Sequence, residues 1–145
     1  MENYLTFLSF GDQGWSDEIA RGVLVTVALA LTTLPLGLFI GFVVALGKQS
    51  EEWTLRTAAE TYTTIFRGLP ELLTLFLVYF GLQLGIQQAL RAIGLETYIE
   101  INSFIAGVIA LALVFSSYAS EVFLSAFRAI PKGQYEGGYA LGLRH

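Results

Sequence analysis

The sequence contains no cysteine and only one histidine, His145. Without cysteine the chain cannot form a disulfide framework, a thiolate metal site or a cysteine nucleophile, and a single histidine at the end of the sequence excludes a histidine-rich metal cluster. Charged residues are also scarce, at 14%, and the net charge is −4. Nucleic-acid binding requires clustered Lys and Arg. We therefore expect no nucleic-acid partner, no metal, no cofactor and no catalytic residues.

Apolar residues dominate what is present. Hydrophobic residues make up 54% of the sequence, and the mean hydropathy is +0.62. Soluble domains carry about a quarter charged residues, so this composition indicates an integral membrane protein. A helix of about 20 apolar residues crosses a bilayer. The pattern predicts an all-α, polytopic membrane protein with three transmembrane helices at about 22–46, 60–86 and 104–127.

The first predicted helix contains a pair of glycines on one face. Residues 23–46 include no charged side chain, and Gly37 and Gly41 are four positions apart. Small residues at this spacing allow another helix backbone to approach closely. The pattern favours a helix-packing face over a binding role for these glycines.

The second predicted helix opens with polar residues. At about 100° per residue, four of them share one narrow stripe of a helix: Glu60, Thr64, Arg67 and Glu71. Gly68 and Pro70 are expected to break the regular hydrogen bonding beside this stripe. Two interpretations are open. Glu60 and its neighbours line a solute pathway, or the charged residues lie solvated at the membrane surface.

The third predicted helix, 104–127, contains a single charged residue, Glu121. A carboxylate at the centre of a transmembrane helix costs roughly 2.5–3.5 kcal/mol and normally has a partner. The pattern favours a structural partner within the helix bundle over direct contact with solute.

Basic residues near the helix ends predict the orientation. Lys and Arg are enriched in cytoplasmic segments of membrane proteins. One side of the predicted bundle has Lys48, Arg56, Arg128, Lys132 and Arg144, whereas the other has only Arg21 and Arg91. The N-terminus is therefore expected outside, and residues 129–145 in the cytoplasm.

Glycines and a lysine at 41–48 approximate a phosphate-binding loop but do not form one. Five residues separate Gly41 from Gly47 where the motif has four, and Gln49 occupies the position of the magnesium-binding Ser or Thr. The chain therefore has no nucleotide site of its own, so any ATP would be hydrolysed by another subunit.

Two stretches resemble motifs of a known family. Residues 60–73 read ETYTTIFRGLPELL and are followed by YFGLQ at 79–83; residues 118–123 read YASEVF and are followed by AIPKGQ at 129–134, which lead to Glu136 and Gly142. Together they resemble polar amino acid permeases of bacterial ATP-binding-cassette importers, in the histidine/lysine/arginine or opine branch. The resemblance covers residues 14–145.

The resemblance implies a transporter subunit in the bacterial inner membrane. Its expected partners are ATPase subunits, a second permease subunit (a sister or a second copy), a periplasmic amino-acid-binding protein and membrane lipid. Such permeases usually have five transmembrane helices, so the chain is expected to be truncated at its C-terminus. Import proceeds by alternating access, and the resemblance leaves open which amino acid or opine is moved.

The resemblance also assigns roles to residues. The segment 129–145 looks like the start of the cytoplasmic "EAA" loop, a helix that docks on the ATPase. Its coupling residues are Glu136, Gly137, Gly138, Tyr139, Ala140, Leu141 and Gly142. Apart from the resemblance, the polar stripe and the intramembrane carboxylate lead us to assign the substrate pathway to Glu60, Thr64, Arg67 and Glu121.

The chain departs from the family pattern at two places. Leu124 stands where an arginine is usual, and Arg128, one turn later, is a candidate to replace it. Gly137-Gly138 replaces Ala-Ala, and each glycine costs about 1 kcal/mol of helix propensity. Two other functions are alternatives: a membrane anchor or assembly subunit without transport, and an ATP-independent channel.

Overall fold

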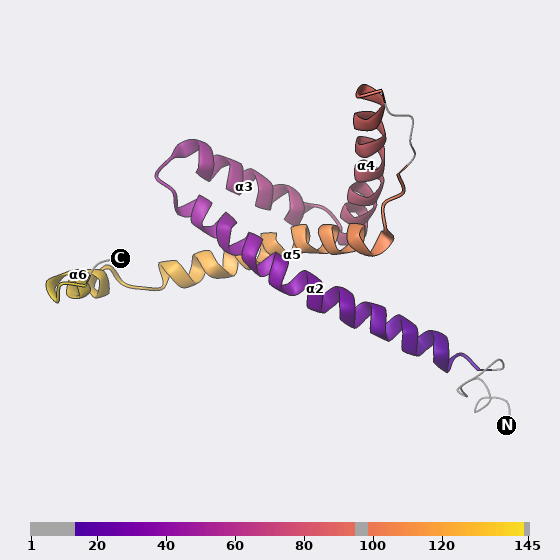
Figure 1. The fold of residues 1–145 in the computed structure, drawn as a ribbon. Helices are drawn as coiled ribbons and strands as arrows, with labels where there is room; N and C mark the ends of the chain where they lie inside the picture. The colour runs from indigo at the N-terminus through magenta and orange to yellow at the C-terminus, as the bar shows by residue number, and fades with distance from the viewer. Residues whose placement is uncertain (1–13, 95–98, 144–145) are drawn as a thin grey trace.

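The computed structural model describes residues 14–94 and 99–143. Helices follow one another along this part of the chain: α2 (Ser16–Gln49), α3 (Trp53–Gly68), α4 (Glu71–Ala92), α5 (Ser103–Arg128) and α6 (Lys132–Ala140) (Figure 1). The described residues contain no strand. The all-α class predicted from composition is confirmed.

Helix α2 begins before the predicted position 22 and continues for 34 residues. Asp17 and Glu18 lie in its first turn and Lys48 in its last. Acidic residues near the N-terminus and basic residues near the C-terminus of a helix interact favourably with its dipole. These charged residues therefore stabilise the turns of α2 that lie on either side of its apolar segment.

The second predicted helix, 60–86, is divided in the structure. Helix α3 ends at Gly68 and α4 starts at Glu71, and the two helices point in different directions (Figure 1). Pro70 has no backbone N–H to donate, and a residue that precedes proline favours an extended backbone. Leu69 is extended, with φ −96° and ψ 140°. The Gly68 to Pro70 segment therefore separates two helices instead of distorting one.

Side-chain amides of α4 hold the segment that returns to α5. Gln83 Nε2 donates to the carbonyl of Ile99 at 2.7 Å, and Gln87 Nε2 donates to the same oxygen at 3.0 Å. The backbone N–H of Ile101 donates to Gln83 Oε1 at 3.0 Å. These bonds satisfy backbone groups that have no helical partner. They fix the segment that precedes α5 against the second half of α4.

Helix α5 is the centre of the bundle. The Asn102 side chain caps it by accepting a hydrogen bond from the N–H of Phe104 at 2.8 Å. It contacts α2, α3 and α4, and its contact with α2 is the most extensive. Small residues make up much of its buried face: Ala106, Ala110, Ala112, Ser116, Ser117, Ala119 and Ser120.

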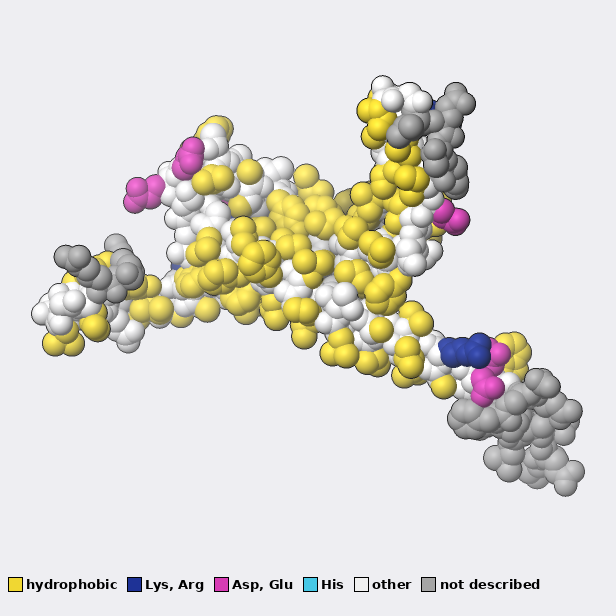
Figure 2. Space-filling view, in the orientation of Figure 1, with side chains coloured by type: hydrophobic (Ala, Val, Ile, Leu, Met, Phe, Trp, Pro, Cys, Tyr) yellow, Lys and Arg dark blue, Asp and Glu magenta, His cyan; other side chains and the backbone are white. Residues whose placement is uncertain are grey.

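Within the described residues, α2, α4 and α5 are each long and apolar enough to cross a membrane. Figure 2 shows hydrophobic side chains spread over the outer surface of these helices. Such an outer surface suits lipid and not water. The chain is therefore a multi-pass membrane protein.

Helix α6 follows α5 after a short connection and extends beyond the bundle (Figure 1). Pro131 precedes it with an extended backbone, φ −63° and ψ 145°. Gly142 has φ +78° and closes the helix, because the N–H of Leu143 then donates to the carbonyl of Gly138 at 3.0 Å. A glycine in the left-handed conformation is a common helix end.

Candidate functional site

Three helices meet at a cluster of one carboxylate and two cations. Lys48 Nζ of α2 lies 2.6 Å from Glu121 Oε1 of α5, and Arg67 NH1 of α3 lies 2.9 Å from the same oxygen. The Lys48 side chain is 5% exposed, whereas those of Glu121 and Arg67 are 35% and 46% exposed. We call Lys48, Arg67 and Glu121 the ion cluster.

The charges of the ion cluster do not cancel. Glu121 supplies one negative charge and the two basic residues supply two positive ones, so the cluster has a formal charge of +1. Lys48 is the most buried member, and a buried charge requires a partner because it has lost its hydration. Glu121 therefore has a structural role as the counter-ion of Lys48 inside the bundle.

Helix α3 is fastened to α5 at two further points. The Arg67 guanidinium carbon lies 5.7 Å from the centre of the Tyr118 ring, a cation–π geometry. The Tyr62 hydroxyl donates to the carbonyl of Leu113 at 3.0 Å and shares a hydrogen bond of 2.7 Å with Ser116 Oγ. These contacts hold the polar stripe of α3 beside the ion cluster.

The predicted packing role of the α2 glycines is confirmed. A Cβ atom added at Gly41 would lie 2.9 Å from the Cβ of Ala119 and 3.0 Å from the carbonyl oxygen of Ser116. At Gly37 it would lie 2.5 Å from the Phe115 ring. Only glycine permits this approach of α2 to α5.

The structure brings together two of the four predicted pathway residues. Arg67 and Glu121 form an ion pair. Glu60 and Thr64 are exposed on α3, and the Thr64 hydroxyl donates to the carbonyl of Glu60 at 2.8 Å. In the part of the chain that is described, Glu60 has no ion-pair partner. Its role in solute recognition stays a prediction.

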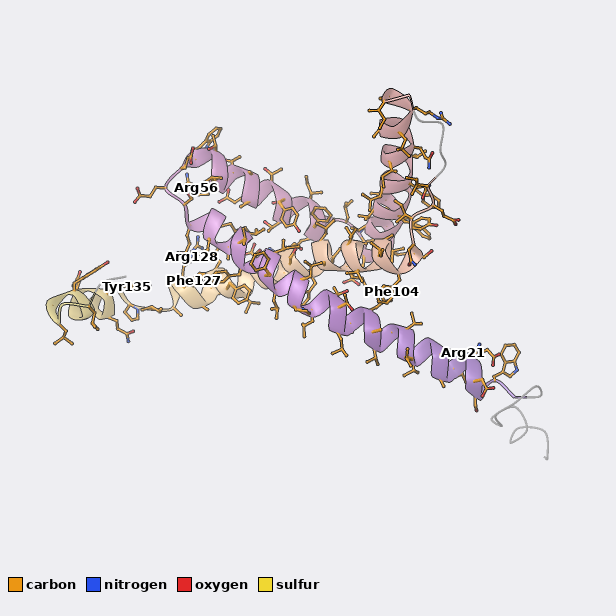
Figure 3. All side chains as sticks on the ribbon, viewed as in Figure 1. Arg21, Arg56, Phe104, Phe127, Arg128 and Tyr135 are labelled. Atoms are coloured by element: carbon orange, nitrogen blue, oxygen red, sulfur yellow. The ribbon has the colours of Figure 1, made fainter. Side chains whose placement is uncertain are left out.

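The partners of Glu121 differ from the one proposed on sequence grounds. Arg128 lies exposed at the C-terminal end of α5 (Figure 3), and the residues that pair with Glu121 are Lys48 and Arg67. Leu124, at the position where the family has arginine, is buried. Glu121 thus pairs with cations from two other helices and not with one on its own helix.

Sequence reasoning placed Lys48 in a flanking segment and missed its pairing. A signal was present, because Gly37, Gly41, Ala45 and Lys48 recur at helical spacing and all four are buried. A lysine that continues a stripe of small packing residues points into the bundle. Tyr62 and Ser116 gave no comparable signal.

The predicted coupling residues lie in and after α6. Glu136 to Ala140 belong to the helix, and Leu141 and Gly142 form its end. Tyr139 is 54% exposed and Leu141 is 82% exposed. Figure 3 shows Tyr135 of α6 away from the bundle. Across the described ranges, 14–94 and 99–143, no group of three His, Cys, Asp or Glu is placed to hold a metal ion.

Comparisons find similar proteins along most of the chain. Residues 34–145 match the family described as "Binding-protein-dependent transport system inner membrane component". The nopaline transport system permease protein NocQ of Agrobacterium fabrum is 40% identical over 140 residues, which are 96% of this chain and 59% of NocQ. The histidine/lysine/arginine/ornithine transport system permease protein HisQ of Salmonella typhimurium is 36% identical over 132 residues, 91% of this chain and 58% of HisQ.

A solved structure has the same fold. It is described as the crystal structure of an amino acid ABC transporter with histidines. The TM-score is 0.64 and the identity 28%, over 93% of this chain and 60% of the other. The chain thus spans less than two thirds of the length of these relatives. Because the family match covers most of the sequence, the chain belongs to the family of binding-protein-dependent transport system inner membrane components.

Proposed function

We propose that the chain is a permease subunit of an ATP-driven importer for polar, mainly cationic, amino acids or opines. The observation that carries the proposal is similarity along nearly the whole chain to permeases whose names specify nopaline and histidine/lysine/arginine/ornithine transport. The subunit is a transporter component and not an enzyme, and separate ATPase subunits hydrolyse ATP.

The proposed assembly lies in the bacterial inner membrane. Two permease subunits, this chain and a sister subunit or a second copy, move between outward-open and inward-open states. A periplasmic binding protein delivers the solute. The distribution of Lys and Arg supports a periplasmic N-terminus and a cytoplasmic α6.

Helix α6 is the proposed contact with the ATPase. It extends clear of the α2–α5 bundle (Figure 1), and Tyr139 and Leu141 expose large apolar surfaces. Exposed apolar groups outside the membrane-spanning helices favour a protein partner. Residues Glu136 to Gly142 would dock on the ATPase subunit. Motion of that subunit would then reach α5 through the short connection between α5 and α6.

The proposed substrate pathway includes Glu60, Thr64, Arg67 and Glu121. The ion cluster joins α2, α3 and α5 through one carboxylate oxygen. A rearrangement of these helices would change which cation is paired. Glu60 is available for a cationic solute because it has no ion pair within the described residues.

Reconstitution tests the proposal. The complete complex in liposomes, with its binding protein, is expected to accumulate arginine or histidine only when ATP is hydrolysed. Uptake that persists with a hydrolysis-deficient ATPase would contradict the importer and favour a channel. Absence of uptake for every amino acid and opine in a panel would favour an assembly subunit.

Uptake by two glutamine variants tests whether the Glu60 carboxylate takes part in solute recognition. Glu60→Gln is expected to reduce cationic amino acid uptake severalfold while the complex still assembles. Glu51→Gln is the matched control, because Glu51 is exposed in the turn between α2 and α3. Equal uptake by the two variants would remove Glu60 from the pathway.

A further inference from the structure

Residues 99–102 have no regular secondary structure and lead into α5 at Ser103; we call residues 99–103 the return segment. Three hydrogen bonds from side-chain amides of α4 hold it, and we call them the amide clasp. Gln83 takes part in two of them, because it donates to the Ile99 carbonyl and accepts from the Ile101 N–H. A side-chain amide that both donates and accepts pairs with this backbone as a neighbouring strand would.

The amide clasp gives the return segment a defined shape. A backbone without regular structure keeps one conformation only where its polar groups are bonded. Glu100 lies between the two residues bonded to Gln83 and is exposed, as are Asn102 and Ser103. Together with Ile101 these residues line an open hollow of about 410 Å³. The clasp therefore presents a preorganised polar surface.

Polar side chains gather in the half of α4 that carries the amide clasp. Residues 72–82 contain no charged side chain and no amide, whereas residues 83–91 contain three glutamines and Arg91. Such side chains favour the membrane surface over its hydrocarbon core. Figure 1 shows this end of α4 pointing away from the other helices. With α6 in the cytoplasm, as proposed, a crossing by α5 places the return segment on the periplasmic side.

From these observations we infer that Gln83 is a positioning residue for docking of the periplasmic binding protein. This inference rests on the proposed function. Gln83 acts through the amide clasp, which holds the return segment in the shape that the binding protein contacts. A surface that is ordered before binding loses less conformational entropy when its partner arrives, so the partner binds it more tightly.

Glu100 specifies the chemistry of this contact. Its side chain is exposed, and both ion pairs of the described residues are made by Glu121. Opposite charges across an interface speed association and fix its register. A Lys or Arg side chain of the binding protein is therefore expected to face Glu100. Glu100→Gln should raise the concentration of binding protein needed for half-maximal stimulation of ATP hydrolysis.

The test is a titration of the complete complex in lipid nanodiscs with its binding protein, loaded with L-arginine. ATP hydrolysis gives the half-saturating concentration of binding protein and the maximal rate as separate quantities. Gln83→Leu keeps the side-chain volume nearly constant but removes both hydrogen bonds of Gln83. It is expected to raise the half-saturating concentration about tenfold. The basal rate and the maximal rate should stay within about twofold of wild type, because the helix bundle is unchanged.

Three variants separate docking from structural damage. Gln88→Leu is the matched control, because Gln88 is exposed on the same helix and takes no part in the amide clasp. It should leave the half-saturating concentration unchanged. Gln83→Glu keeps the acceptor for Ile101 but loses the donor to Ile99, so an increase of about threefold is expected. Gln87→Leu removes one bond of the clasp and should have a similar effect.

The two kinetic quantities decide the outcome. A higher half-saturating concentration at an unchanged maximal rate supports the inference. A lower maximal rate at an unchanged half-saturating concentration overturns it, because Gln83 would then serve only the helix bundle. If Gln83→Leu does not assemble, Gln87→Leu decides, and wild-type titration by that variant overturns the inference. ATP-driven uptake by the wild-type complex would leave the importer proposal standing in those cases, whereas a wild type without stimulation or uptake overturns both.

Discussion

Replacing Gly41 with alanine tests how closely α2 and α5 must pack. The new Cβ would lie 2.9 Å from the Cβ of Ala119, 3.0 Å from the carbonyl oxygen of Ser116 and 3.3 Å from the backbone nitrogen of Ser120. Carbon atoms pack best at about 3.5–4.0 Å. None of these atoms belongs to a long flexible side chain. The helices must therefore move apart by several tenths of an ångström.

Two opposing terms set the size of the effect. Overpacking of a well-packed interface costs about 1–3 kcal/mol. Alanine in place of glycine recovers about 1 kcal/mol of helix propensity. Gly41→Ala is therefore expected to lower the free energy of unfolding by about 1 kcal/mol, and by up to about 2 kcal/mol.

Gly22 supplies the matched control on the same helix. A Cβ atom at Gly22 would meet nothing within 4 Å, so Gly22→Ala has the propensity term without the steric one. The difference between the two variants isolates the steric cost of about 1–3 kcal/mol. Equilibrium unfolding of the purified full-length subunit in mixed detergent and SDS micelles, followed by circular dichroism, measures it. Equal stability of the two variants would refute close packing at Gly41.

Three further predictions concern other contacts. Glu121→Gln leaves Lys48 buried without a counter-ion and is expected to cost about 3–5 kcal/mol in the same unfolding assay; adding Lys48→Met should recover most of the loss, and no recovery would contradict the pairing. Tyr62→Phe removes the hydrogen bonds to α5 and is expected to cost about 0.5–1.5 kcal/mol, whereas wild-type stability would argue against those bonds. Gly137→Ala meets no neighbouring atom, so it should stabilise α6 by about 1 kcal/mol and raise the helix content of a peptide covering 129–145; unchanged helicity would contradict this reading.

The sequence predicted those features that depend on local pattern. The long apolar runs of α2 and α5 follow from composition and length, and the role of Gly37 and Gly41 follows from their spacing. The break between α3 and α4 was only partly predictable. Gly68 and Pro70 indicated irregular hydrogen bonding, but neighbouring helices can accommodate proline inside a membrane helix. Whether the helix bends or ends depends on what packs around it.

The ion cluster shows what local pattern does not determine. Glu121 required a partner, yet Lys48 is 73 residues away in sequence and Arg67 is 54. Their meeting depends on the register of α2 and α3 against α5. Any of the eight Lys and Arg residues could in principle neutralise the Glu121 carboxylate, so the sequence alone did not identify its partners.

The small residues between α2 and α5 also affect the mobility of the bundle. Glycine and alanine lose almost no side-chain conformational entropy when they are buried, unlike leucine or methionine. Packing of these small residues between α2 and α5 therefore restricts few rotatable side-chain bonds. We expect α2 and α5 to move as one rigid body.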